Sequence, residues 1–523
     1  MKKITVVFFM GVAILAASCK KYLDINDNPN AAVSATPELI LPQALTATAS
    51  NASGYNSYGS QLVGYMANAG GYGGFGTAIT YNWSSSDFQG RWTTSYNNLE
   101  DYQAILNQTD AQLPLYSYFN AAARIMKAYN FELLVDAYND VPYSQALKGS
   151  DVLTPAYDNA ADIYDSLAVE LDKAIATIND AQNAQGTTIK DLGASDVMFS
   201  GDMDKWKQLA NTIKLRLIVR ASGKVNFPNT SFDSTGFLTD DALINPGYTL
   251  DVNRQNPQWE TWAFTSTGGA GNKAWMPTNY VFSYYDGTKL LDSGRGSAIY
   301  YKYPTTGTNR LGIESSTLQS SPTGSFWYSG TDRNPSTAGN VPGVLKGPNA
   351  GYPLMIAAES YFLQSEAVLR GILTSGDASA LFYDGIKASF HYIYELPDGT
   401  IQGDPVADEQ QYEQNNKNNY LVNFALATTP DKKTEAIITQ KYIALNFIRG
   451  EEAWNEYRRT HYPRIITSDN SGIYNFASPV SESTQPDKLP TRILYPTSEG
   501  ANNSANVPKN ISPFTSYIFW ALQ

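Results

Sequence analysis

The fold of this chain is decided by a stretch in its first third, 119-FNAAARIMKAYNFELLVDA-137. Apolar residues recur in it at spacings of three and four, at Phe119, Ala122, Met126, Tyr129, Leu133 and Ala137. This spacing places them along one face of an α-helix, because a helix completes one turn about every 3.6 residues. Val141-Pro142 follows the stretch, and the proline predicts the end of the helix.

The same pattern returns along the chain. One further stripe comprises Ile163, Leu167, Leu171, Ala174 and Ile178, another comprises Trp206, Leu209, Ile213 and Leu217, and two more helical segments lie near 356–370 and 437–459. Successive helices joined by turns favour antiparallel pairs stacked as in tetratricopeptide arrays. Trp206-x-x-Leu209 fits the opening of that repeat, but no strict period exists. The predicted fold class is therefore mostly α, an irregular tetratricopeptide-like helical scaffold.

Helical periodicity is absent between about residues 253 and 345, where Gly, Ser, Thr, Asn and Pro alternate with aromatic residues. A region of this length is too long for a bare loop inside a compact domain. We expect a large loop-rich insertion containing short strands, one of them near 299–303. The segment 70–92 has the same composition. Loops held on a rigid scaffold commonly carry function, so we expect the ligand in these two segments.

Five tryptophans lie in these segments and outside every helical stripe: Trp83, Trp259, Trp262, Trp275 and Trp327. We predict that as a group they form aromatic platforms for a ligand. The alternative is that each ring only fixes its own insertion to the scaffold. Trp206 and Trp454 fall within predicted helices, so we assign them to the core.

Cys19 is the only cysteine, and it ends a segment built like a signal peptide. Two lysines come first, an apolar run from Ile4 to Leu15 follows, and small residues precede the cysteine. LAASC resembles a bacterial lipobox in which the leucine stands one place early. We predict a signal peptide at 1–18, a tether at 19–36 lipidated on Cys19, and one folded domain at 37–523. The alternative is a plain secretory signal, which would leave a reactive thiol unpaired in an exported protein.

The rest of the sequence argues against several classes of function. No apolar run of about 18 residues follows Cys19, so we expect contact with the membrane through the lipid anchor only. A net charge of −12 disfavours nucleic acid as a partner. With two histidines and no second thiol, we expect no metal site, and no Gly-x-Ser-x-Gly nucleophile motif occurs. Two carboxylates that meet in space to hydrolyse a glycosidic bond remain open.

One motif matches in its residues but not in the structure predicted around it. Residues 71–76 satisfy the dinucleotide fingerprint G-x-G-x-x-G, which needs a strand before it and a helix after it. Here 62–69 has a helical pattern and 77–83 an extended one. We therefore predict neither a nucleotide nor any other cofactor.

Four segments, in order, resemble one family. Residues 19-CKKYLDINDNPN-30 look like the mature start of SusD/RagB-type nutrient-binding outer-membrane lipoproteins. Residues 355-MIAAESYFLQSEA-367 are similar to the "AEAYLLYAEA" helix of that family. The stretch 440-QKYIALNFIRGEEAWNEYRRTHYP-463 resembles its "QKWIALF…EAWxDYRRTGYP" element, and 490-PTRILYPTSE-499 resembles its closing segment. The charged residues within these matches, among them Glu359, Glu366, Arg458 and Arg459, are expected to hold helices together.

The resemblance implies a lipid-anchored, cell-surface protein of the outer membrane that is not an enzyme. It implies a SusC-like TonB-dependent channel as partner and an oligosaccharide as ligand. Aromatic platforms beside polar side chains suit the apolar faces and hydroxyls of sugars. Three alternatives stay open: a peptide as ligand, a helical glycoside hydrolase, and a scaffold that serves only protein assembly.

Overall fold

The computed structural model describes residues 35–523. The predicted signal peptide, Cys19 and nearly all of the predicted tether lie outside the described residues, and the division into leader, tether and one domain stays a prediction. None of the described helices combines the length and apolar character needed to cross a bilayer.

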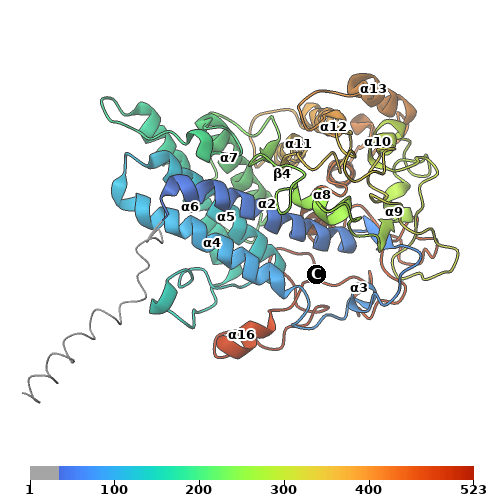
Figure 1. Ribbon diagram of the computed structural model, residues 1–523, viewed down its shortest axis with the longest axis horizontal. Helices are drawn as coiled ribbons and strands as arrows, with labels where there is room; N and C mark the ends of the chain where they lie inside the picture. Colours follow the sequence, from blue (N-terminus) through green and yellow to red (C-terminus); the bar gives the residue numbers. More distant parts are fainter. Residues whose placement is uncertain (1–34) are drawn as a thin grey trace, which may run out of the picture.

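The N-terminal half is a stack of long helices that pack against their neighbours in the chain (Figure 1). They are α2 (Pro37–Leu62), α4 (Gln89–Thr109), α5 (Ser117–Tyr138), α6 (Ala160–Asn183) and α7 (Met203–Arg220). The helix predicted from the opening stretch is α5, and it is buried on nearly all sides because α2, α4, α6 and α7 all contact it. Side-chain caps fix two helix starts: Asn159 accepts from the Ala161 amide, and Asp202 accepts from the amides of Asp204 and Lys205.

The C-terminal half adds a second group of helices: α11 (Ala357–Leu369), α12 (Ala378–Tyr394), α13 (Pro405–Asn415), α14 (Pro430–Ala444), α15 (Gly450–Thr460) and the short α16 (Thr497–Asn502). The predicted helix at 437–459 is in fact two, α14 and α15, separated at Phe447, whose φ is +61°. Helix α15 returns to pack on α2. Gly59 and Gly450 permit this crossing, because a Cβ on Gly59 would lie 2.1 Å from the backbone nitrogen of Glu451.

The insertion is irregular, with short elements only: α8 (Pro257–Trp262), β3 (Trp275–Pro277), α9 (Asn279–Phe282) and α10 (Ser293–Ile299). The prediction of a strand near 299–303 is wrong, because α10 ends there in a series of turns. Around the glycine-rich segment the local predictions are also reversed: β1 (Met66–Asn68) precedes it and the single turn α3 (Thr77–Thr80) follows. β1 pairs antiparallel with β3, and β2 (Ala242–Ile244) pairs antiparallel with β4 (Tyr352–Met355). The fold is mostly α, as predicted.

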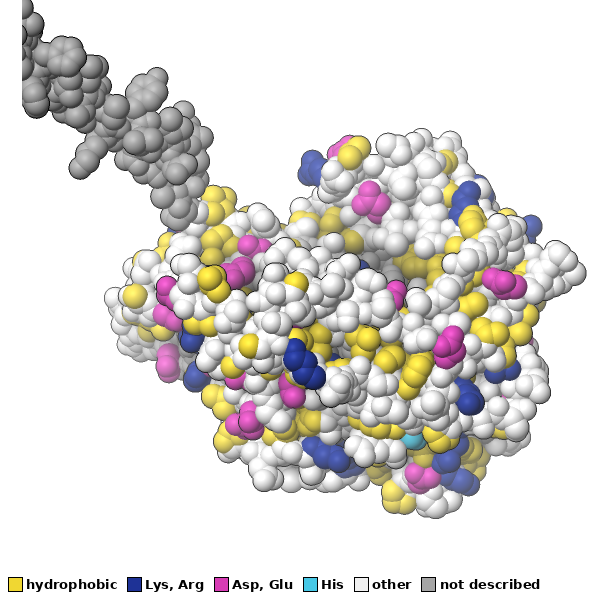
Figure 2. Space-filling model, turned by 90° about the horizontal axis from the view of Figure 1, so that it is seen from below, with side chains coloured by type: hydrophobic (Ala, Val, Ile, Leu, Met, Phe, Trp, Pro, Cys, Tyr) yellow, Lys and Arg dark blue, Asp and Glu magenta, His cyan; other side chains and the backbone are white. Residues whose placement is uncertain are grey.

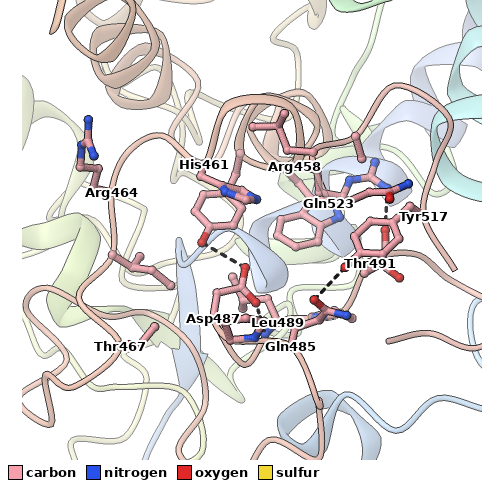
Figure 3. Close-up of a pocket in the computed structure, with 17 residues that line it drawn as sticks. Arg458, His461, Arg464, Thr467, Gln485, Asp487, Leu489, Thr491, Tyr517 and Gln523 are labelled. Atoms are coloured by element: carbon pink, nitrogen blue, oxygen red, sulfur yellow. Dashed lines mark hydrogen bonds between the residues drawn. The ribbon is translucent and has the colours of Figure 1, made fainter. Parts of the chain in front are cut away.

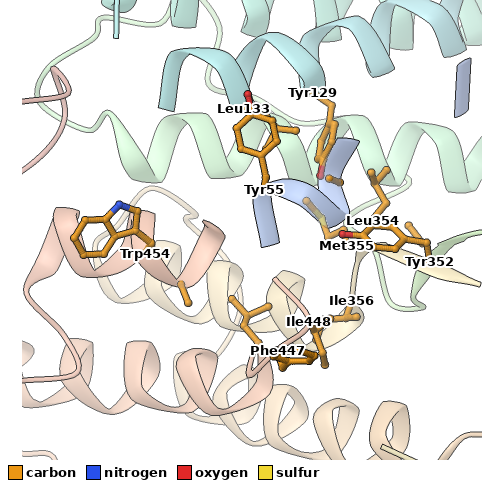
Figure 4. Close-up of a cluster of buried hydrophobic side chains, with 14 of the residues drawn as sticks. Tyr55, Tyr129, Leu133, Tyr352, Leu354, Met355, Ile356, Phe447, Ile448 and Trp454 are labelled. Carbon is orange, nitrogen blue, oxygen red and sulfur yellow. The ribbon is translucent and has the colours of Figure 1, made fainter. Parts of the chain in front are cut away.

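Two kinds of interior hold the halves together. Figure 4 shows apolar side chains from α2, α5, β4, α15 and the link between α14 and α15 meeting in one cluster. Beside it runs a chain of buried ion pairs: Arg216 contacts Glu132 at 2.6 Å and Glu359 at 2.8 Å, and Lys441 contacts Glu452 at 2.7 Å. Arg220 joins the two groups through Glu132, Asp136 and Glu452. Glu359, Glu366 and Arg459 take part in this network, which confirms their expected structural role.

Candidate functional site

The two loop-rich segments that the sequence marked for function lie side by side. Strand β1 runs directly into the glycine-rich segment 70–76, and its partner β3 belongs to the insertion, with Asn68 opposite Trp275. Beyond the strands the contact continues, because the amide of Gly70 donates to the carbonyl of Gln319 at 2.9 Å. A Cβ on Gly70 would lie 2.1 Å from the carbonyl oxygen of Leu318, so only glycine allows this approach.

Asn68 fixes the register of the junction. Its Nδ2 donates to the carbonyl of Ile313 at 2.7 Å, and its Oδ1 accepts from the amide of Gly312 at 2.9 Å. Its own carbonyl accepts from Nδ2 of Asn309 at 3.0 Å. The side chain is 1% exposed, so these bonds are made away from water, where a missing partner is costly.

A groove of about 390 Å³ opens at this junction. It is lined by Asn68, Ala69, Gly70, Gly71, Tyr72, Glu314, Ser315, Ser316 and Leu318. We call it the junction groove. Tyr72 is the exposed aromatic residue in it, with 46% of its surface accessible, and glycines on both sides leave its ring uncovered. Glu314, Ser315 and Ser316 also line the groove and are exposed, so they offer a carboxylate and two hydroxyls.

Glu314 is the one charged residue that lines the groove. Figure 2 shows one face of the whole molecule, on which separate charged and hydrophobic side chains lie among uncharged polar groups. Within residues 35–523, no three His, Cys, Asp or Glu side chains are grouped so that they could hold a metal ion. The groove thus offers one aromatic face and a rim of hydrogen-bonding groups, which can bind a hydroxylated ligand without catalysing a reaction.

The five predicted platform tryptophans require a correction, because all of them are buried. Trp83, Trp259, Trp262, Trp275 and Trp327 are between 1% and 7% exposed. Trp327 stacks on Phe447 of the scaffold with ring centroids 4.2 Å apart, and Trp262 meets the same phenylalanine edge-on. Trp259 packs on Tyr328 and Trp83 on Phe88. A loop-rich segment has no helical stripe to bury, so large rings supply its interior.

Trp262 and Trp327 therefore fix the insertion to the scaffold, the alternative that the sequence left open, whereas the other three rings pack against aromatic residues of the loop-rich segments. Trp275 comes nearest to the groove, since it pairs with Asn68, but Phe75 covers its ring edge-on at 5.4 Å. Trp206 and Trp454 lie in the core, 0% and 1% exposed, as assigned. Sequence reasoning missed Tyr72 because the only indication of its exposure is weak: glycines stand on both sides of it, and they have no side chain to cover its ring.

Two family models match the chain. Residues 29–263 match the model "Starch-binding associating with outer membrane", of the SusD-like type, and residues 338–516 match "Susd and RagB outer membrane lipoprotein". The stretch between the two matches falls within the insertion. No curated protein sequence matches.

Solved structures share the fold along the whole molecule. A SusD homolog from Bacteroides fragilis is 21% identical, with a TM-score of 0.66 over 94% of this chain and 100% of that one. A SusD/RagB family protein from Bacteroides thetaiotaomicron is 20% identical, with a TM-score of 0.68 over 93% and 99%. A chitin-binding SusD homolog from Flavobacterium johnsoniae is 22% identical, with a TM-score of 0.60 over 93% and 95%.

Proposed function

The chain belongs to the SusD/RagB family of outer membrane lipoproteins, and from this premise we propose that its junction groove captures an oligosaccharide for a SusC-like TonB-dependent channel. The family consists of nutrient-binding proteins rather than enzymes, which removes the glycoside hydrolase from the alternatives.

The observation that carries the proposal is the exposed ring of Tyr72 beside Glu314, Ser315 and Ser316. A sugar ring has an apolar C–H face that stacks on an aromatic ring, and its hydroxyls bond to carboxylates and other hydroxyls. The groove volume of about 390 Å³ suits a short segment of glycan rather than a whole chain. Because two relatives of the same fold are described as chitin-binding, chito-oligosaccharides are the first ligands to try.

Calorimetry on the purified chain tests the site. Chitohexaose, maltohexaose, cellohexaose and an unrelated hexapeptide are titrated into the unsubstituted protein, Tyr72→Ala and Tyr474→Ala. Tyr474 is a matched control, because it is 42% exposed and does not line the groove. We expect Tyr72→Ala to weaken glycan binding by about 1–3 kcal/mol and Tyr474→Ala to leave it unchanged. Equal affinity of the Tyr72 variant refutes the site, and binding of the peptide alone refutes the glycan.

Attachment and delivery form the second part of the proposal. We place the lipid on Cys19, so Cys19→Ala expressed without the channel gene should leave the membrane fraction while retaining the fold. Retention at the level of the unsubstituted protein refutes the anchor. A TonB-dependent channel should co-purify with the lipidated protein from detergent-solubilised outer membranes, and its absence there refutes the partner.

A further inference from the structure

A second cavity, unrelated to the junction groove, lies at the end of α15 (Figure 3). Its volume is about 430 Å³, and it shares no residue with the groove. One side is formed by Trp454, Tyr457 and Arg458 on a single face of α15, together with His461, the residue that follows the helix. Residues 485–491 and 517–523 close the opposite side. We call it the α15 cavity.

Asp487 is the carboxylate in this cavity. It accepts hydrogen bonds from the Tyr457 hydroxyl at 3.3 Å and from the Leu489 amide at 3.0 Å. In the described part of the chain, no cationic side chain lies within 4.0 Å of it. Burial raises the pKa of Asp487, as expected for a carboxylate that is partly withdrawn from water without an ion pair.

The arginines around the cavity are already engaged elsewhere. Arg458 donates to the carbonyls of Thr491 at 3.1 Å and Asp136 at 2.8 Å. Arg464 pairs with Asp431 and Glu435, both at 3.0 Å, and Figure 3 shows its guanidinium directed away from Asp487. His461 lies at the exposed rim, beyond ion-pair distance from Asp487, and its charge partly offsets the rise in the pKa of that carboxyl. The cavity therefore presents an unpaired anion, with its nearby guanidinium groups turned to other acceptors.

The remaining surface is largely apolar and aromatic. Pro486, Leu489, Pro490 and Ile465 line it together with the ring of Tyr517, whose hydroxyl is bonded to Gln485 at 2.7 Å. A cavity with apolar walls and a carboxylate outside any ion pair complements an uncharged organic stem that carries a cation.

We propose that the α15 cavity binds an ammonium or guanidinium group carried on an organic stem, with Asp487 as its counter-ion. The cation supplies the charge partner that the described structure does not provide. Such a group occurs on a lysine or arginine side chain of a peptide and on an amino sugar. This proposal is independent of the groove, because glycan binding at Tyr72 requires nothing from α15.

Titration calorimetry with the purified chain tests the proposal. Probes are Gly-Lys-Gly and Gly-Arg-Gly with acetylated N-termini and amidated C-termini, together with glucosamine. Gly-Gln-Gly blocked in the same way and N-acetylglucosamine are the uncharged counterparts. We expect at least one cationic probe to bind at least tenfold more tightly than its uncharged counterpart. Whether a tripeptide or glucosamine shows this preference identifies the source of the cation. Equal affinities within both sets, or no binding of any cationic probe, overturn the proposal.

Three variants locate the binding. Asp487→Asn should weaken the cationic probe at least tenfold, and Asp180→Asn, an exposed charge on α6, should not. Thr467 is an exposed residue of the cavity, so Thr467→Trp should block entry without removing a buried group. If Asp487→Asn lowers the melting temperature, binding by the Thr467 variant decides whether the cavity is the binding site. Undiminished binding by the Thr467 variant, or by a folded Asp487 variant, refutes the site.

Discussion

The interior of the scaffold and the interior of the insertion are built from different chemistry. Between the helices, guanidinium and carboxylate groups such as Arg216, Glu132 and Glu359 are buried in direct contact. Inside the insertion rings predominate beside one buried ion pair, Arg295 with Asp292 at 2.6 Å. The indole N–H groups of Trp259, Trp262 and Trp327 have no hydrogen-bond partner among the described residues. Ion pairs demand one geometry, whereas rings tolerate several.

This contrast between the two interiors indicates where a ligand can bind. Aromatic content in a loop-rich segment is not evidence for an exposed platform, because such a segment needs its rings to make a core of its own. The surface left for a ligand is the seam where the insertion meets β1, and there the exposed ring is a tyrosine between glycines. Substitutions in the scaffold and in the insertion test this contrast separately.

The largest effect is expected in the ion network. Arg220→Ala leaves Glu132, Asp136 and Glu452 without a common partner, in positions no more than 4% exposed. We expect a loss of about 3–5 kcal/mol in the free energy of unfolding, measured by urea denaturation. Arg254→Ala is the control, because its side chain is 62% exposed and its ion pair spans 4.0 Å. A loss below 1 kcal/mol for Arg220→Ala, as a rough limit, would show that the network is not structural.

A somewhat smaller effect is expected from the rings. Trp327→Ala removes a ring stacked on Phe447 and should lower the free energy of unfolding by about 3 kcal/mol through the cavity it leaves. Affinity for the glycan should be unchanged in the fraction that remains folded. Melting curves measure the stability of the variant, and calorimetry measures its affinity for the glycan. The opposite result, lost affinity with intact stability, would restore Trp327 as a platform.

The sequence predicted the scaffold well, since helix formation depends on a local pattern that α5, α6 and α7 repeat without interruption. The break between α14 and α15 was missed because it depends on a tertiary contact, the crossing of Gly59 and Gly450. The site was predicted only as a region. Which of several aromatic residues stays exposed is decided by long-range contacts, such as the stacking of Trp327 on Phe447, that no local pattern records.

A smaller loss of stability is expected from a substitution where β1 meets the insertion. Asn68→Ala removes the bonds to Ile313 and Gly312 and leaves the Gly312 amide unpaired, whereas the Ile313 carbonyl keeps the bond from Nδ2 of Asn309 at 2.9 Å. We expect a loss of about 1–3 kcal/mol in stability, measured by urea denaturation, with weaker glycan binding. Asn82→Ala, whose exposed side chain bonds Glu482 outside the groove, should change neither quantity. A destabilised Asn68 variant with full affinity would separate the seam from the ligand site.

The smallest effect concerns a carboxyl group of the scaffold that has no ion pair among the described residues. Glu409 is 5% exposed, and its Oε1 has no hydrogen-bond partner in the described chain. Burial, with the neighbouring Glu413, raises the pKa of Glu409 from 4.5 to about 7. The folded state therefore keeps a proton that the unfolded state has already lost, so stability falls as the pH rises through this interval.

Glu409→Gln imitates the protonated form at every pH. We expect it to stabilise the protein by about 1 kcal/mol at pH 8 and to have almost no effect near pH 4.5, because one pKa unit corresponds to about 1.4 kcal/mol and Glu413 shares part of the shift. Denaturation curves at the two pH values measure the difference. Glu100→Gln, at an exposed carboxyl on α4, is the control. A stabilisation that is equal at both pH values would mean that the gain comes from packing rather than from the proton, and Glu409 would then belong with the neutral interior instead of with the charged one.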